Sequence, residues 1–147
     1  MANGMHTLIR VHEWDVDEKR RFLASLLNHI SALERQGRDL ETEIKREQGV
    51  AAASQEVNFA YGAYAEVAIG RREDIADNIV RTEVEIAAAQ DVLTEAYREL
   101  KTYEIAQENR QREEKLELDR KERAELDEIG IRGFRRLNKG LLGGDMS

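Results

Sequence analysis

The chain has 147 residues, a formal net charge of −7, no cysteine and no proline. An acidic chain without a dense basic block is a poor match for nucleic-acid phosphates, and a chain without cysteine has no disulfides or thiol chemistry. It has no apolar run of about 18 residues and no secretory signal pattern, so we expect no membrane-spanning helix and a cytoplasmic location.

A first long helix is predicted over about residues 7–53, with Thr7 as its N-cap. Apolar residues recur there at seven-residue steps, and a second row follows three residues behind, the pattern of a narrow coiled-coil seam. Gly37 interrupts the first row, where we expect close approach of a partner helix or a local bend. The two rows are Ile9, Val16, Leu23, Ile30, Gly37 and Ile44, and Leu26, Leu33 and Leu40.

A hairpin tip is predicted over about residues 54–64, because the heptad pattern breaks there. The segment contains Ser54, Asn58 and Gly62, which favour turns and caps. It also contains three of the eight aromatic residues of the chain. Their side chains either pack the tip or form an exposed knob that docks a partner. These residues are Phe59, Tyr61 and Tyr64.

A second helix is predicted over about residues 65–137. Its apolar row of Ile79, Ile86, Leu93 and Leu100 matches that of the first helix when the two run antiparallel. Two registers satisfy the pattern, with the numbers of facing residues summing to about 116 or about 123. The first places Gly37 opposite Ile79, and the second places Ile44 opposite Ile79.

The apolar rows end near Gln107, although the chain still favours a helix. The window from Gln107 to Arg123 contains twelve charged residues among seventeen. The first helix has no residues left to face this stretch, so the second helix should overhang the first. We therefore predict an all-α fold in which residues 1–147 form a single coiled-coil domain, an antiparallel two-helix hairpin with a flexible tail over residues 138–147.

No catalytic, cofactor-binding or metal-binding pattern is present. His6, His12 and His29 have no metal-ligand spacing, and the carboxylates lie on solvated helix faces without a pocket that would shift their pKa. The glycine-rich end has no phosphate-loop pattern. We expect no enzyme, no cofactor and no metal.

Two further apolar surfaces are candidates for binding a partner. Trp14 falls opposite the seam. Three interpretations are open: Trp14 anchors a partner, packs against Phe134 and Leu137 folded back onto it, or contacts another copy of the chain. The second surface follows the charged stretch and lies among Arg132, Arg135 and Arg136; it suits a protein partner or, as a weaker alternative, a membrane surface. Its apolar residues are Leu126, Ile129, Phe134 and Leu137.

Three stretches read together resemble one known family. They are LIRVHEWDVDEKRRFLASLL, NFAYGAYAEVAIGRRE and LTEAYRELKTYEIAQENRQREEKLELDRKERAELDEI. In this order they are similar to the FliJ family of bacterial flagellar export proteins, over nearly the whole chain. The resemblance implies an antiparallel two-helix coiled coil whose second helix is long.

The resemblance also implies a function in flagellar type III protein export, and therefore in motility. Such a protein binds the hexameric ring of the export ATPase as a stalk-like rod, contacts the export gate membrane protein and cycles substrate chaperones. On this hypothesis the chain is a monomer that acts as an adaptor and general chaperone at the inner-membrane face and associates with the membrane only through partners. The alternative is a structural coiled-coil protein that self-associates through the overhang, unrelated to export.

Overall fold

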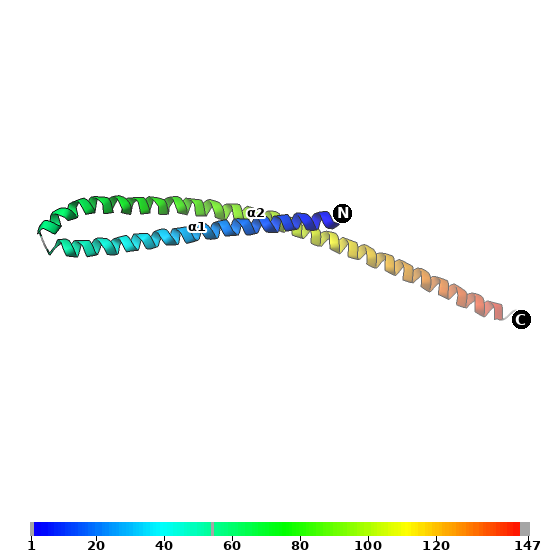
Figure 1. The fold of residues 1–147 in the computed structure, drawn as a ribbon. Helices are drawn as coiled ribbons and strands as arrows, with labels where there is room; N and C mark the ends of the chain where they lie inside the picture. Colours follow the sequence, from blue (N-terminus) through cyan, green and yellow to red (C-terminus); the bar gives the residue numbers. More distant parts are fainter. Residues whose placement is uncertain (1, 54, 145–147) are drawn as a thin grey trace. The chain divides into compact units, whose positions relative to one another are not determined.

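The structure is a computed structural model that describes residues 2–53 and 55–144, and all of these except Ala52 and Ala53 are helical. Helix α1 (Ala2–Ala51) has 50 residues and helix α2 (Gln55–Gly144) has 90. Figure 1 shows the two helices joined by a short connection. The predicted all-α helical hairpin is confirmed.

Both helices extend beyond the predicted bounds. Helix α1 begins at Ala2 rather than near Thr7, and α2 begins at Gln55, ten residues before the predicted start. The expected tip is therefore helical, because a helix interior tolerates Asn58 and Gly62 at about 1 kcal/mol or less each relative to alanine. Helix α2 also continues to Gly144 through most of the expected tail, and residues 145–147 lie outside the described part of the chain.

Helix α1 ends in hydrogen-bonded turns, which lead into the short connection to α2. The Ala52 amide donates to the Gln48 carbonyl and the Ala53 amide donates to the Val50 carbonyl, both at 3.1 Å. These bonds satisfy carbonyls that a helix end would otherwise leave unpaired. No residue of the described chain has a positive φ.

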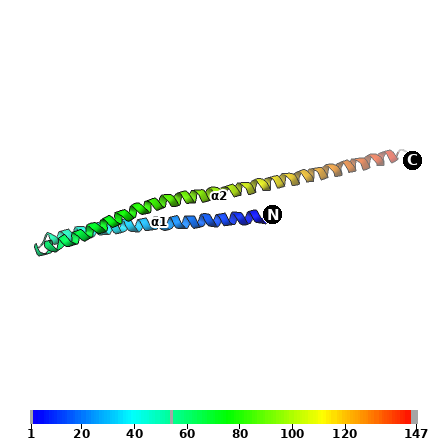
Figure 2. The same cartoon turned by 90° about the horizontal axis from the view of Figure 1, so that it is seen from above.

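Contacts divide the chain into two units, Met1–Leu100 and Lys101–Ser147. The first unit is the hairpin, in which α1 lies antiparallel to the first part of α2 (Figure 1 and Figure 2). A narrow row of side chains is buried between the two helices, with mainly large residues on α1 and mainly small ones on α2. The buried residues of this row include Val16, Leu26, Leu33, Leu40, Ala68, Ala89, Ala96 and Leu100.

The register differs from both of the registers predicted. A methyl group on Gly37 would lie 3.7 Å from Cγ2 of Ile75, so Gly37 faces Ile75 and not Ile79. The contacts between the helices join residues whose numbers sum to 111–114, one helical turn away from the closer prediction. The earlier start of α2 moves the tip toward the N-terminus and accounts for this shift. The contacts that define the register are the approach of His12 Nδ1 to the Glu99 carboxylate at 3.8 Å and the ion pairs Glu41–Arg72 and Glu43–Arg71.

Thr82 is a polar residue in the buried row. Its side chain is only 4% exposed, so its hydroxyl needs a hydrogen-bond partner to avoid a desolvation penalty. The hydroxyl donates to the Asn78 carbonyl one turn earlier in α2, at 2.7 Å. The helix itself therefore satisfies Thr82, and the facing residue of α1 can be apolar.

The aromatic residues expected at the tip form the first turns of α2. Tyr64 and Ile75 pack against a buried cluster formed by Leu40, Ile44 and Ala68. The Tyr64 hydroxyl is buried with no hydrogen-bond partner within bonding distance, and the Glu43 carboxylate lies near it. Burial, together with this negative charge, raises the pKa of the Tyr64 phenol above its ordinary value of 10.0.

In the second unit α2 continues, and none of its described side chains is buried as those of the hairpin are. Tyr103, Glu104 and Gln107 are half-buried, and every described side chain from residue 108 to residue 140 is exposed. Arg110 Nε lies 3.4 Å from the Glu114 carboxylate one turn later. Burial therefore ends where the apolar rows of the sequence end.

We expect the hairpin to depend on the residues of its buried row. Leu40 is 2% exposed, so Leu40→Ala should lower the free energy of unfolding by about 2–5 kcal/mol. Leu118 is 59% exposed, so the matched variant Leu118→Ala should change it by less than about 0.5 kcal/mol. Urea unfolding followed by circular dichroism measures both values, and equal losses would contradict the assignment of the core.

Gly37 is not required for close approach of the helices. A methyl group at this position meets Ile75 at an ordinary van der Waals distance of 3.7 Å. Gly37→Ala should therefore stabilise the hairpin by about 1 kcal/mol through its higher helix propensity. A lower melting temperature for this variant would show that the backbones approach more closely than the structure indicates.

The packing of Tyr64 predicts a dependence of stability on alkaline pH. Because its pKa is raised in the folded chain, folding favours the neutral phenol; this contribution is present below the unfolded pKa near 10 and is lost as pH rises through the folded pKa. The free energy of unfolding should fall more steeply with rising pH in the parent chain than in Tyr64→Phe. Ultraviolet titration of the phenolate provides a direct check: parallel stability curves and a Tyr64 midpoint at or below 10 would refute the proposed burial.

Candidate partner-binding surfaces

Trp14 lies on the outer surface of α1. Its side chain is 64% exposed and borders a shallow depression formed by side chains of the first turns of α1. Val11, one turn earlier, is also more than half exposed. The structure therefore places Trp14 where a partner can reach it, as the position opposite the seam predicts. The residues that line the depression are His6, Thr7, Arg10, Val11 and Trp14.

The aromatic residues near the tip have two different environments. Phe59 is 92% exposed, whereas Tyr61 and Tyr64 are half-buried, with ring centroids 5.9 Å apart. Tyr64 packs against the hairpin core, which corresponds to the packing interpretation of the sequence. Phe59 is the member of the group that is free of the core and available as an anchor for a partner.

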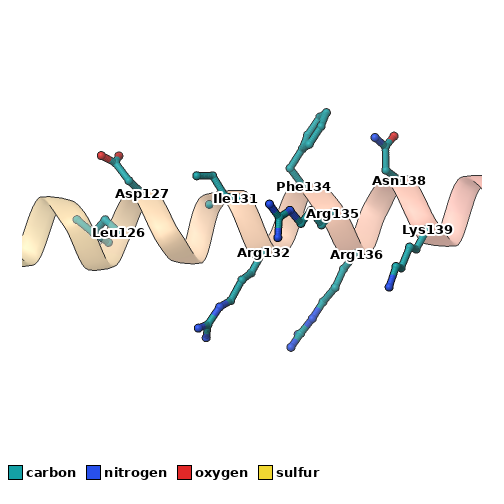
Figure 3. A pocket seen from close by; sticks show the side chains of 10 residues that line it. Leu126, Asp127, Ile131, Arg132, Phe134, Arg135, Arg136, Asn138 and Lys139 are labelled. Atoms are coloured by element: carbon teal, nitrogen blue, oxygen red, sulfur yellow. The ribbon is translucent and has the colours of Figure 1, made fainter.

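The apolar residues near the C-terminus lie on one exposed stretch of α2. Leu126, Ile129, Phe134 and Leu137 are each about two-thirds exposed. Figure 3 shows that Phe134 projects from one side of the helix, whereas Arg132 and Arg136 project from the other. Arg132 and Arg136 are thus separated from Phe134 around the helix axis, although Asp127 projects to the same side as Phe134.

An apolar groove on the hairpin lies outside the surfaces predicted from the sequence. It is lined by residues of both helices, and Phe22 and Val92 remain about half exposed at its edges. In the sequence this groove corresponds to small and apolar residues that recur every four residues along α2, such as Ala88 and Val92. This spacing is weaker than the heptad pattern of the seam. The residues that line the groove are Lys19, Phe22, Glu85, Ala88, Ala89 and Val92.

The described residues include neither a metal-type cluster nor a membrane-spanning helix. No group of three or more His, Asp or Glu side chains is placed to hold a metal ion. No helix of residues 2–53 and 55–144 combines the length and the apolar character needed to cross a membrane.

Comparison with known proteins identifies the family. The model of the family described as "Flagellar FliJ protein" matches residues 1–139. The flagellar FliJ proteins of Caulobacter vibrioides strains NA1000/CB15N and ATCC 19089/CIP 103742/CB 15 are each 29% identical to the chain over 132 residues, which is 90% of this chain and 95% of each relative. No solved structure shows a significant match. The family match spans nearly the whole hairpin and the exposed part of α2, and the chain therefore belongs to the FliJ family of flagellar proteins.

Proposed function

We propose that the chain is an adaptor and general chaperone of flagellar protein export that binds the hexameric export ATPase in the manner of a stalk. It also contacts the export gate membrane protein and the chaperones of export substrates, and it acts in the cytoplasm at the inner-membrane face of the export apparatus. Family membership supports an export-related role, and the exposed stretch of α2 from Glu108 supports binding through this helix.

Helix α2 stays helical through Gly144 although its side chains from residue 108 to residue 140 are exposed, and this feature supports the proposal most directly. A partner can cover these residues without displacing any contact of the hairpin. The stretch from Gln107 to Arg123 has six acidic and six basic residues, and its apolar residues are Leu116 and Leu118. Such a surface favours reversible, electrostatically selected binding over permanent burial.

The adaptor acts by binding and not by catalysis. General acid–base catalysis needs a group whose pKa is tuned by an enclosed environment. The described carboxylates instead lie on exposed or half-exposed faces of two helices. We accordingly propose a monomeric, non-enzymatic component that needs no cofactor.

A second candidate function is that of a structural coiled coil that self-associates. The exposed apolar edges of the groove at Phe22 and Val92 favour it, because a second helix could cover them. This candidate requires a stable dimer at low micromolar concentration. Light scattering that gives the mass of one chain would exclude it and support the monomeric adaptor.

Truncation after Gln107 tests the proposed function. The removed residues bury little surface, so the shortened chain should remain helical by circular dichroism. It should lose co-sedimentation with the cognate export ATPase, which the full chain should retain at low micromolar concentration. Val80→Ser serves as a control, because it changes an exposed residue of the hairpin outside the candidate binding surfaces and leaves the removed stretch intact.

The same chains can be tested in a strain that lacks the gene. The full chain should restore swimming in soft agar and secretion of flagellar subunits, and the truncated chain should restore neither. Full motility of the strain without any complementing chain would overturn the role in export. Unfolding of the truncated protein would instead refute the division between a self-sufficient hairpin and a binding helix.

A further inference from the structure

The C-terminal part of α2 differs in charge from the rest of the chain. Residues 129–144 contain four basic residues and no acidic residue, although the chain as a whole has a net charge of −7. The acidic remainder would be repelled by an anionic surface, whereas this segment would be attracted to it. The basic residues are Arg132, Arg135, Arg136 and Lys139.

The basic side chains are available for binding. Arg132 Nη2 lies 2.8 Å from Glu128 Oε1, and both of these side chains are about two-thirds exposed, so this ion pair is weak. Within the described part of the chain, Arg135, Arg136 and Lys139 are exposed and form no ion pair with a carboxylate. An anionic partner therefore gains three free cations without breaking an internal contact.

The apolar side chains of the same segment lie apart from the basic ones. Figure 3 shows Arg132, Arg136 and Lys139 directed to one side of the helix and Ile131 and Phe134 to the other, together with Asp127, which precedes the acid-free segment that begins at Ile129. Leu126, Ile129 and Leu137 are also about two-thirds exposed. Because arginine and lysine have long apolar stems, their charges can reach headgroups while the neighbouring apolar side chains enter the acyl boundary.

Basic residues beside a broad set of exposed apolar residues favour binding to a lipid surface over binding in a protein groove. At 100° per residue, the exposed apolar residues from Leu126 to Leu137 spread over about half of the helix circumference, much wider than the narrow row that α1 covers in the hairpin. A broad apolar arc beside a basic one is typical of helices that lie in the membrane interface. Anionic headgroups supply the complementary charge for residues 129–139, which contain four basic residues and no acidic residue.

We propose that residues 129–139 form an amphipathic membrane-binding helix that contacts anionic phospholipid directly. This contact is additional to the membrane association through partners that the proposed function includes, and it does not require the export ATPase. The basic side chains bind the headgroups, and Phe134 with the neighbouring leucine and isoleucine side chains enters the interface. The acidic hairpin stays in the aqueous phase.

Flotation of the purified full-length chain with vesicles tests the proposal. The chain should float with vesicles of phosphatidylcholine mixed with phosphatidylglycerol and not with phosphatidylcholine alone, and added salt should weaken the binding. The double variant Arg135→Gln/Arg136→Gln should bind at least about tenfold more weakly, since each basic residue near the surface contributes about fivefold. Phe134→Ser should also weaken binding about tenfold or more by removing a large apolar side chain.

Matched variants outside the segment provide the controls. Arg120→Gln/Arg123→Gln makes the same change in net charge, and Leu118→Ser removes an exposed apolar side chain from the same helix. Both should bind vesicles as the parent does. Equal weakening by the control variants, or no binding to the anionic vesicles at low salt, would overturn the proposal.

A fluorescence measurement locates the inserted side chain. In a Trp14→Phe background, Phe134→Trp should show a blue-shifted emission with anionic vesicles and quenching by brominated acyl chains, whereas Leu118→Trp should show neither. The export ATPase is assayed separately without lipid. If Arg135→Gln/Arg136→Gln abolishes ATPase binding while vesicles leave the tryptophan emission of the Phe134→Trp variant unchanged, the segment is a protein-binding surface and the lipid proposal is wrong.

Discussion

Burial of one narrow row of side chains between two helices is the constraint on which the rest of the structure depends. Neither helix has a second buried face, so the hairpin is stabilised mainly by residues such as Leu33 and Leu40 on α1 packed against α2. Small residues such as Ala89 and Ala96 let the larger side chains of the facing helix fill the space between the backbones. Where this row ends, the helix continues but its side chains are exposed.

The heptad rows were enough to predict the two helices, their antiparallel pairing and the point near Gln107 where burial ends. They were not enough to predict the register, because α2 has two apolar rows three or four residues apart, and a slide of one helical turn brings the other row into the seam. The position of the turn decides between such registers. Asn58 and Gly62 suggested a turn, but residues of this kind also occur inside long helices, and the chain turns at Ala52 and Ala53 instead.

The candidate surfaces could be predicted only in part, because some of them depend on the register of the two helices. Trp14 and Phe59 fall outside the apolar rows, and the structure places both side chains in solvent. Tyr64 could be assigned to the core only once the register was known, because Leu40 and Ile44 must lie beside it. The groove at Phe22 and Val92 follows a weaker spacing, and it depends on which faces of the two helices adjoin.

The width of the buried row has a consequence for how the hairpin opens. In a globular core each residue is held by neighbours in all directions, whereas here a residue depends chiefly on those just before and after it along the row. The pair of helices therefore resembles a zipper, and separation at one end leaves the remainder closed. Near the start of α1, half-buried His12 and Lys19 alternate with Ile9 and Val16, so amide hydrogens there should exchange before those beside Leu33.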